Sequence, residues 1–339
     1  MKVLVGLGIS MLVGLAGVLA FSPRSMPTLR PTDIPLERMQ IDGVEETRIG
    51  WVIAGESGHI LISRDQGRSW SEATISPSRQ ALITRLVFAD DTHGLALGHE
   101  GLILRTADGG RSWKEAAYQE EGGEPLMDAA RLPSGDWLAV GAFGRVLRSS
   151  DAGKTWRSES LPGLTDWHLN AIAASADRQQ WLIVGEAGTL LRSLDAGVHW
   201  QAVEPFYNGS LYGAVSLGES VWVAYGMRGQ VFRSGDDGLS WTAIRMPRPV
   251  SLYAGTLGPD GRLLLVGQGG VVLASDDRGL TFQVLRETGQ ENLTDLLVPA
   301  SGPWLLTSDA GLRTFARPDS EQRTAAQSPL GSSLQGIPQ

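Results

Sequence analysis

The chain has 339 residues, of which 42% are hydrophobic and 19% are charged, as in folded globular proteins with a sizeable core. It contains no cysteine, which excludes disulfides, thiolate metal sites, cysteine nucleophiles and a lipid-modified N-terminal cysteine. Its formal net charge of −8 disfavours nonspecific binding to nucleic acid, so we expect no nucleic-acid partner.

Residues 1–20 are an apolar N-terminal segment. Lys2 precedes the uncharged run VLVGLGISMLVGLAGVLAFS, and residues 18–20 offer small side chains for cleavage. This pattern predicts a signal peptide and export. The run is also as long as the roughly 20 residues that cross a bilayer, so an uncleaved N-terminal anchor stays open. Residues 21–34 follow as a linker.

From residue 35 to residue 316 one short pattern returns: Ser or Thr, then Asp, Gly and an aromatic residue at fixed spacing. Six copies recur about every 43 residues, with the aspartates at Asp65, Asp108, Asp151, Asp195, Asp236 and Asp277. In a turn, an aspartate accepts hydrogen bonds from the backbone N–H groups just ahead of it, and glycine permits positive φ. Carboxylates that recur once per repeat would lie far apart, so we interpret all six as structural rather than catalytic or metal-binding.

Two glycines separated by two residues precede each box, as in Gly185 and Gly188, with apolar strand-like segments on both sides. This order predicts four short strands per repeat. A seventh copy, WLLTSDAGLRTF, places Ser308 and Gly311 in the hairpin positions and has no box of its own. Seven such repeats predict an all-β, seven-bladed β-propeller. Because the last repeat lacks an outer strand, we expect residues 31–36 to supply one and close the ring. Residues 317–339 are polar and predict a disordered tail.

These boxes resemble the Asp-box, or BNR-type, repeat of β-propellers. Their presence in nearly every blade, together with the GxxG hairpin and the LR[ST] sequence, is similar to the photosystem II stability and assembly factor-like family. The resemblance covers about residues 35–316. It implies an exported, non-enzymatic and monomeric propeller without cofactors. Such a protein would bind a membrane or envelope protein complex, assist its assembly or stability, and itself associate with the membrane.

The resemblance also implies a basic patch of arginines near the boxes. Here the residue before the box Ser or Thr is arginine in four blades, whereas Ile62 and Ala274 interrupt the series. These candidate partner-binding residues are Arg105, Arg148, Arg192 and Arg233. The alternative is that each arginine packs its stem along the blade and stacks on a nearby aromatic ring.

The innermost strands can be aligned at the mouth of the central channel. Six side chains near their first residues could converge there and hold a small ligand: Arg85, Asp128, Asn170, Tyr212, Tyr253 and Asp295. The alternative is a wet, polar channel without a ligand. Trp167 and His168 enter blade 4 on the same face, where they would either contact a partner or pack on a neighbouring blade.

An enzymatic alternative is a sialidase-like glycoside hydrolase with its site at the channel mouth. Sialidases use a tyrosine nucleophile and three arginines that bind the substrate carboxylate. Tyr212 and Tyr253 are available, but Arg85 is the only clear arginine in the channel-facing series. We therefore expect no catalytic residues. The five histidines are scattered along the chain, so we also expect no metal site.

Overall fold

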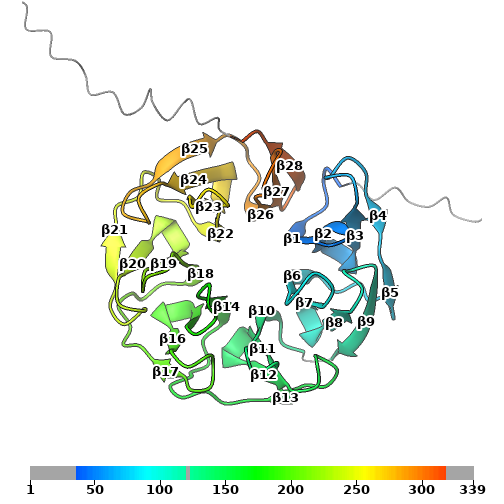
Figure 1. Ribbon diagram of the computed structural model, residues 1–339, viewed down its shortest axis with the longest axis horizontal. Coiled ribbons are helices and arrows are strands. Elements are labelled where there is room, and N and C mark those ends of the chain that lie inside the picture. The colour runs from blue at the N-terminus through cyan, green and yellow to red at the C-terminus, as the bar shows by residue number, and fades with distance from the viewer. Residues whose placement is uncertain (1–35, 120–122, 318–339) are drawn as a thin grey trace, which may run out of the picture. The chain divides into compact units, whose positions relative to one another are not determined.

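The computed structural model describes residues 36–119 and 123–317. Their strands form seven sheets, and Figure 1 shows these sheets set around a common centre in chain order, from blue to red. The protein is a seven-bladed β-propeller, which confirms the fold predicted from the repeats. In the described ranges, no helix has the length and apolar character needed to cross a membrane.

Each blade begins with an innermost strand and continues with an antiparallel second strand. The innermost strands are β1 (Ile41–Thr47), β6 (Ile83–Phe88), β10 (Leu126–Arg131), β14 (Leu169–Ala174), β18 (Leu211–Ser216), β22 (Leu252–Leu257) and β26 (Leu293–Leu297). The second strands are β2 (Gly50–Gly55), β7 (Gly94–Gly98), β11 (Trp137–Gly141), β15 (Trp181–Gly185), β19 (Trp222–Gly226), β23 (Leu263–Gly267) and β27 (Trp304–Ser308).

The third strands complete the core of each blade, and the fourth strands form its outer edge. The third strands are β3 (Ile60–Ser63), β8 (Ile103–Thr106), β12 (Val146–Ser149), β16 (Leu190–Ser193), β20 (Val231–Ser234), β24 (Val271–Ser275) and β28 (Gly311–Phe315). The fourth strands are β4 (Ser71–Glu72), β9 (Ser112–Ala117), β13 (Arg157–Ser158), β17 (Gln201–Ala202), β21 (Thr242–Ile244) and β25 (Gln283–Glu287). A further strand, β5 (Thr74–Ser76), leaves blade 1 and pairs parallel to β9 of blade 2, which the sequence did not predict.

The core lies between the blades. Every residue of β15, for example, is buried, and so is every residue of β11 and β19. Because neighbouring blades cover both faces of these strands, their side chains are apolar without the alternation of a half-exposed sheet.

Six tight turns join the second and third strands: η1 (Glu56–Gly58), η2 (His99–Gly101), η3 (Ala142–Gly144), η4 (Glu186–Gly188), η5 (Met227–Gly229) and η6 (Gln268–Gly270). The two glycines of the motif serve different purposes, as η4 shows. Gly185 is extended, but a Cβ there would lie 2.1 Å from the carbonyl oxygen of His168. Gly188 has φ of +70°, a left-handed conformation that favours glycine. The motif therefore marks a close backbone approach followed by a left-handed turn.

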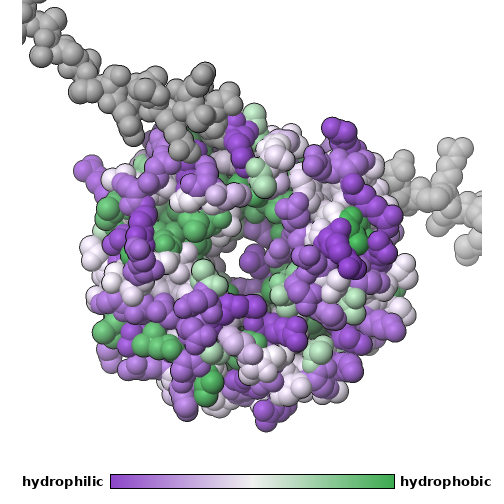
Figure 2. Space-filling model, in the orientation of Figure 1, coloured by the Kyte–Doolittle hydropathy of each residue, from purple (hydrophilic) through white to green (hydrophobic). Residues whose placement is uncertain are grey.

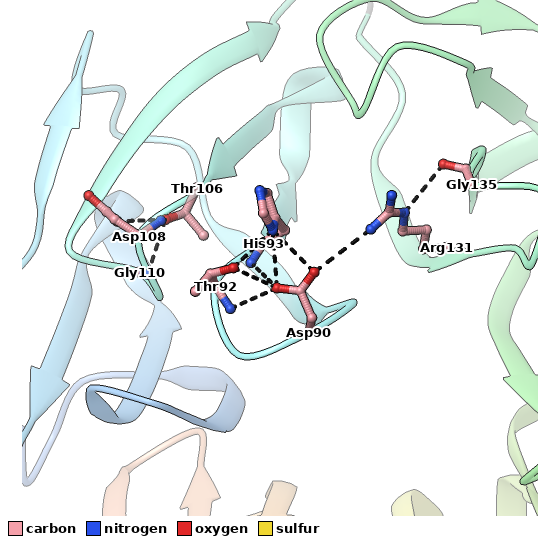
Figure 3. A network of polar contacts seen from close by, with 8 residues as sticks. All are labelled: Asp90, Thr92, His93, Thr106, Asp108, Gly110, Arg131 and Gly135. Atoms are coloured by element: carbon pink, nitrogen blue, oxygen red, sulfur yellow. Dashed lines mark hydrogen bonds and ion pairs between the residues drawn. The ribbon is translucent and has the colours of Figure 1, made fainter.

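The six box turns share one set of hydrogen bonds, and Figure 3 shows two of them in blade 2, between Thr106 and Asp108 and between Thr106 and Gly110. Asp108 accepts from the Thr106 hydroxyl at 2.8 Å, and from the backbone N–H (3.0 Å) and hydroxyl (2.6 Å) of Ser112. The Thr106 hydroxyl in turn accepts from Gly110 N–H, and the Trp113 indole donates to the Gly110 carbonyl. The other boxes repeat these bonds, except that His199 replaces the last hydroxyl in blade 4 and Phe282 lacks the indole donor in blade 6.

The blades give the ring two different ends. The innermost strands begin beside the η turns, as the pairing of Leu169 with Gly185 shows, and we call this the mouth end. The box turns lie at the opposite end, against the loops that join first and second strands, and we call this the box end. There Gly109 N–H donates to the Thr92 carbonyl, and Ala196 N–H donates to that of Gln179. Figure 3 shows such a loop at Asp90, with Arg131 of blade 3 reaching it at 3.8 Å.

The ring closes where blade 7 meets blade 1. Of the predicted closing strand, residues 31–35 lie outside the described ranges and Leu36 lies in a turn, so closure by this segment stays a prediction. Its carbonyl accepts one hydrogen bond from Leu312 N–H at 3.2 Å. Among the described residues, blade 7 has three strands, and its innermost strand instead bonds to β1 through Thr294 and Asp295.

Candidate functional site

The mouth of the channel is shaped by a β-bulge that recurs in all seven innermost strands. In each strand the pairing register shifts at the second residue, and a bulge of this kind re-aims the side chain that it carries. The bulged residues are Asp42, Thr84, Met127, Asn170, Tyr212, Tyr253 and Thr294. Figure 2 shows the opening at the centre of the ring that these strands surround.

Three of the bulged side chains join neighbouring blades. Thr84 donates to the Leu126 carbonyl of the next blade at 2.6 Å. Asn170, predicted as a ligand group, donates from its amide nitrogen to the Leu211 carbonyl at 2.8 Å. Thr294 donates to the carbonyl of Ile41. At this position the polar side chains hold the ring together.

The structure brings Arg85, Asp128 and Asp295 together in the channel. Arg85 Nε lies 3.3 Å from Asp128 Oδ1, and its terminal nitrogen lies 3.3 Å from Asp295 Oδ2. Both carboxylates are nearly buried, with side chains 7% and 14% exposed, whereas that of Arg85 is 35% exposed. We call these three residues the channel ion cluster.

Each carboxylate of the cluster also holds the next blade. Asp128 accepts from its neighbour Ala129 N–H at 2.9 Å and from Ile172 N–H of blade 4 at 3.0 Å. Asp295 does the same with Leu296 N–H and, across the ring closure, with Val44 N–H at 3.3 Å. These contacts explain why two acidic side chains are placed in a nearly buried site: each satisfies a backbone donor of the adjacent strand.

A fourth titratable side chain, Glu45 of β1, belongs to this environment and was missed from the sequence. Burial raises the pKa of Glu45 to about 8, although Arg85 opposes the rise, so this carboxyl is largely protonated at neutral pH. Burial also raises the pKa of Asp128 and of Asp295, again against the effect of Arg85. One guanidinium therefore compensates a channel wall with three carboxyl groups.

The two tyrosines predicted at the mouth lie beside each other, with ring centroids 5.6 Å apart. Burial, and then Tyr253, raises the pKa of Tyr212. Among the described residues, no hydrogen bond or ion pair connects either phenol to the channel ion cluster. The six predicted mouth residues thus separate into an ion cluster, an interblade amide and a tyrosine pair.

Two further exposed aromatic side chains lie at the mouth end, in blades 3 and 4. Phe143 is 59% exposed at the tip of η3, and Trp167 is 51% exposed in the loop before β14. The Phe143 ring stands edge-on to His168 with centroids 4.8 Å apart, and Gly144 N–H donates to the Trp167 carbonyl. Phe143 has φ of +54°, as the middle residue of each η turn has a positive φ, so the backbone conformation belongs to the repeated turn. What distinguishes Phe143 is its exposed aromatic ring, a kind of side chain that is enriched in protein interfaces.

The four predicted partner-binding arginines have different surroundings. Arg148 is only 12% exposed and forms ion pairs with Asp136, at 3.2 Å, and with Glu159. Arg233 donates from Nε to the Arg278 carbonyl of blade 6 at 2.9 Å. Arg192 has a buried Nε without a hydrogen-bond partner among the described residues, and Arg105 lies half-buried on β8.

These contacts do not amount to a uniform row of free guanidinium groups. Arg148 is already neutralised, so it offers little attraction to an acidic partner. None of the four arginines takes part in the two cation–π pairs found in the described ranges, so stacking on an aromatic ring does not describe them either. Next to Arg148, a cavity at the third box is lined in part by Trp156 and by Arg157, which is exposed.

No residue set for a metal ion emerges from the part of the chain that the structure describes. Groups of three or more His, Asp or Glu side chains arranged to hold a metal ion do not occur in it. The guanidinium of Arg85 is occupied by two carboxylates, so the channel offers no free arginine to bind a substrate carboxylate.

The comparisons with known proteins agree with this architecture. A family model described as "Photosynthesis system II assembly factor YCF48" matches residues 39–107 and 126–248. A search of curated proteins finds no match. Among solved structures, "YCF48 bound to D1 peptide" is 17% identical, covers 88% of this chain and 100% of that chain, and superposes with a TM-score of 0.66.

Two further structures show how widely the fold is shared. YCF48 from Cyanidioschyzon merolae is 14% identical and covers 84% of this chain and 97% of its own, with a TM-score of 0.65. A catalytically inactive virginiamycin B lyase from Staphylococcus aureus with quinupristin is also 14% identical, covers 82% of this chain and 95% of its own, and has a TM-score of 0.69. At these identities the structures establish the fold alone. The family model, which spans more than half of the chain, shows that this protein belongs to the photosynthesis system II assembly factor YCF48 family.

Proposed function

We propose that this protein is an exported, non-enzymatic factor that binds a segment of a membrane-protein complex and assists its assembly. The segment binds at the mouth end of the ring. The observation that carries the proposal is the presence of three exposed aromatic side chains at that end, Phe143, Trp167 and Tyr253, which are 59%, 51% and 37% exposed. Aromatic residues of this kind supply much of the binding energy in protein interfaces.

Family membership supports the same reading, and one solved relative is a YCF48 bound to a D1 peptide. In the present chain the channel wall carries the ion cluster, and we propose that a bound segment lies over the exposed aromatic side chains at the mouth end. The apolar run in residues 3–22 supports the exported location, in the periplasm or a thylakoid lumen.

Recovery of detergent-solubilised membrane complexes from the source cells tests this proposal. We expect Phe143→Ser and Trp167→Ser each to reduce recovery at least several-fold without changing the melting temperature, because both side chains are exposed. Leu257→Ser is the matched control, since Leu257 is 43% exposed at the end of β22 away from the mouth and should leave recovery unchanged. Equal recovery by all four proteins would contradict binding at the mouth end.

The glycoside hydrolase remains the alternative function, and the fold shared with a lyase gives a reason to test it. We expect no hydrolysis of sialosides or of common aryl glycosides. A hydrolase activity that disappears in Tyr212→Phe or Tyr253→Phe would place chemistry at the mouth and overturn the non-enzymatic assignment.

A further inference from the structure

The tip of each box turn carries a side chain whose chemistry changes halfway around the ring. The residue directly after the box glycine is basic in blades 1–3 and aliphatic in blades 4–6. These six tip residues are Arg68, Arg111 and Lys154, followed by Val198, Leu239 and Leu280. All six are exposed, and the aliphatic ones are 64%, 53% and 55% exposed.

Nothing within the turn requires this choice of side chains. The same hydrogen bonds form in all six boxes, whether the tip is arginine, lysine or an aliphatic residue. Exposed Leu194, 50% exposed, adds a second aliphatic side chain to the turn that carries Val198. Among the described residues, the three basic tips form no ion pairs. We therefore infer that the tip side chains make contact with a partner outside the ring.

The six tips have equivalent positions in the repeat. Each occupies the same position of the same turn, and Figure 1 shows the blades repeated around one centre, so we expect the six tips to lie at a similar level on the box end. The box carboxylates turn back into their own turns, where Asp236, for example, accepts from the Ser234 hydroxyl and from Ser240 N–H. The tips of the box turns thus form an arc of three cationic side chains followed by three aliphatic ones, and the neighbouring loops at this end also expose acidic side chains such as Asp91 and Glu219.

We propose that the box end rests on the surface of an anionic lipid bilayer. Isolated aliphatic tips on rigid turns suit shallow insertion between headgroups, and lysine and arginine beside them attract anionic lipids. A protein partner fits this arc less well, because a protein interface needs a contiguous apolar patch and these tips are one blade apart. The mouth end then faces away from the bilayer and stays open to a partner.

The chain length before the ring permits this placement. If the apolar run of residues 3–22 is kept as an anchor, residues 23–35 reach at most about 50 Å when fully extended. A tether of this length would keep the propeller close to the membrane, and contact of the tips with the bilayer would orient the box end toward it.

The absence of cysteine allows a test on the full chain. Single-cysteine variants Val198→Cys, Leu239→Cys and Leu280→Cys are labelled with an environment-sensitive fluorophore, and Phe143→Cys is the matched control at the mouth end. Each is mixed with vesicles of phosphatidylcholine and phosphatidylglycerol, or of phosphatidylcholine alone. We expect blue-shifted emission and quenching by nitroxide lipids at the three tips on anionic vesicles, and neither effect at Phe143→Cys. This readout reports position, so it does not depend on whether residues 3–22 bind the vesicles.

A triple variant, Arg68→Gln, Arg111→Gln, Lys154→Gln, removes the three basic tips. We expect it to reduce the blue shift and the quenching of the tip labels several-fold. Added salt should do the same, because it screens the attraction between the basic side chains and the anionic headgroups. Three results would overturn the proposal. The tip labels could remain in water on vesicles that carry the protein, the Phe143→Cys label could insert equally, or the signal could survive neutralisation. Protection of the tips only by a detergent-solubilised complex would likewise overturn it, in favour of a protein partner.

Discussion

Replacing Arg85 by methionine removes the only positive charge of the channel ion cluster while keeping much of the side-chain volume. Asp128 and Asp295 then remain in the channel without a counter-charge. Removing one partner of a buried ion pair costs about 3–5 kcal/mol. Because the Arg85 side chain is 35% exposed, channel water screens the interaction, and we expect a loss of about 2 kcal/mol. At about 2–3 °C per kcal/mol for a domain of this size, the melting temperature should fall by about 4–6 °C at pH 8.

The loss should depend on pH in a defined direction. Burial already raises the pKa of Asp128 and Asp295, and losing Arg85 raises both further. A carboxyl whose pKa is higher in the folded state costs stability as pH rises from its unfolded value through its folded value. The variant should therefore lose less at pH 5, where the carboxyls can hold protons, than at pH 8.

Differential scanning calorimetry at both pH values measures this. Arg157→Met is the matched control, because Arg157 is exposed and forms no ion pair among the described residues, and its melting temperature should not change. Adding Asp128→Asn and Asp295→Asn to Arg85→Met should restore part of the stability at pH 8. An undiminished melting temperature, or an equal loss at pH 5 and pH 8, would refute the assignment of Arg85 as the compensating charge.

Three further predictions concern single side chains. Asp151→Asn should lower the melting temperature by weakening charge-assisted hydrogen bonds to Ser149 and Thr155, and calcium or EDTA should change neither protein; a calcium-dependent shift would contradict a structural role for the box. Glu45→Gln should leave the melting temperature nearly unchanged at pH 4, below the ordinary carboxyl pKa, and raise it progressively up to pH 9, because the raised pKa of Glu45 makes its ionisation destabilising; a pH-independent difference would count against that shift. Arg148→Glu should melt early, since it puts a third carboxylate beside Asp136 and Glu159; an unchanged melting temperature together with lost partner recovery would instead restore Arg148 as a binding residue.

The blade architecture was predictable because its determinants are local. Each box and hairpin fits in a few consecutive residues, and seven repetitions fix the number of blades. The same logic predicted that Asp309 and Ala310 lie in a hairpin and not in a box, and they lie between β27 and β28. The extra strand β5 carries no such repeated signal, since it occurs in one blade only.

The candidate site was only partly predictable because its contacts are not local. Arg85 and Asp295 are 210 residues apart, and they meet only because the ring closes between blade 7 and blade 1. Asp42 and Glu45 were also missed, because the first innermost strand was left out of the sequence alignment. Ile41 and Asp42 are the first two residues of that strand, as the aligned residues are in the other blades. Phe143 had a weak signal: it is the only aromatic residue between the paired glycines of any hairpin. The sequence did not indicate that Arg148 forms ion pairs, because its partner Asp136 lies in a loop without a motif.

Among the described residues blade 7 has three strands, and its outer strand β28 links the stability of the ring to strand addition. β28 has five residues, as β25 has, whereas the outermost strands β4, β13 and β17 have two each, a length that discourages pairing with another chain. An extended segment that pairs with β28 would supply the fourth strand, and it would bind the folded ring but not the unfolded chain. Such binding raises the unfolding free energy with the logarithm of the segment's concentration. The melting temperature of this protein should therefore rise as the concentration of a segment that pairs with β28 increases, so that it measures the binding of such a segment.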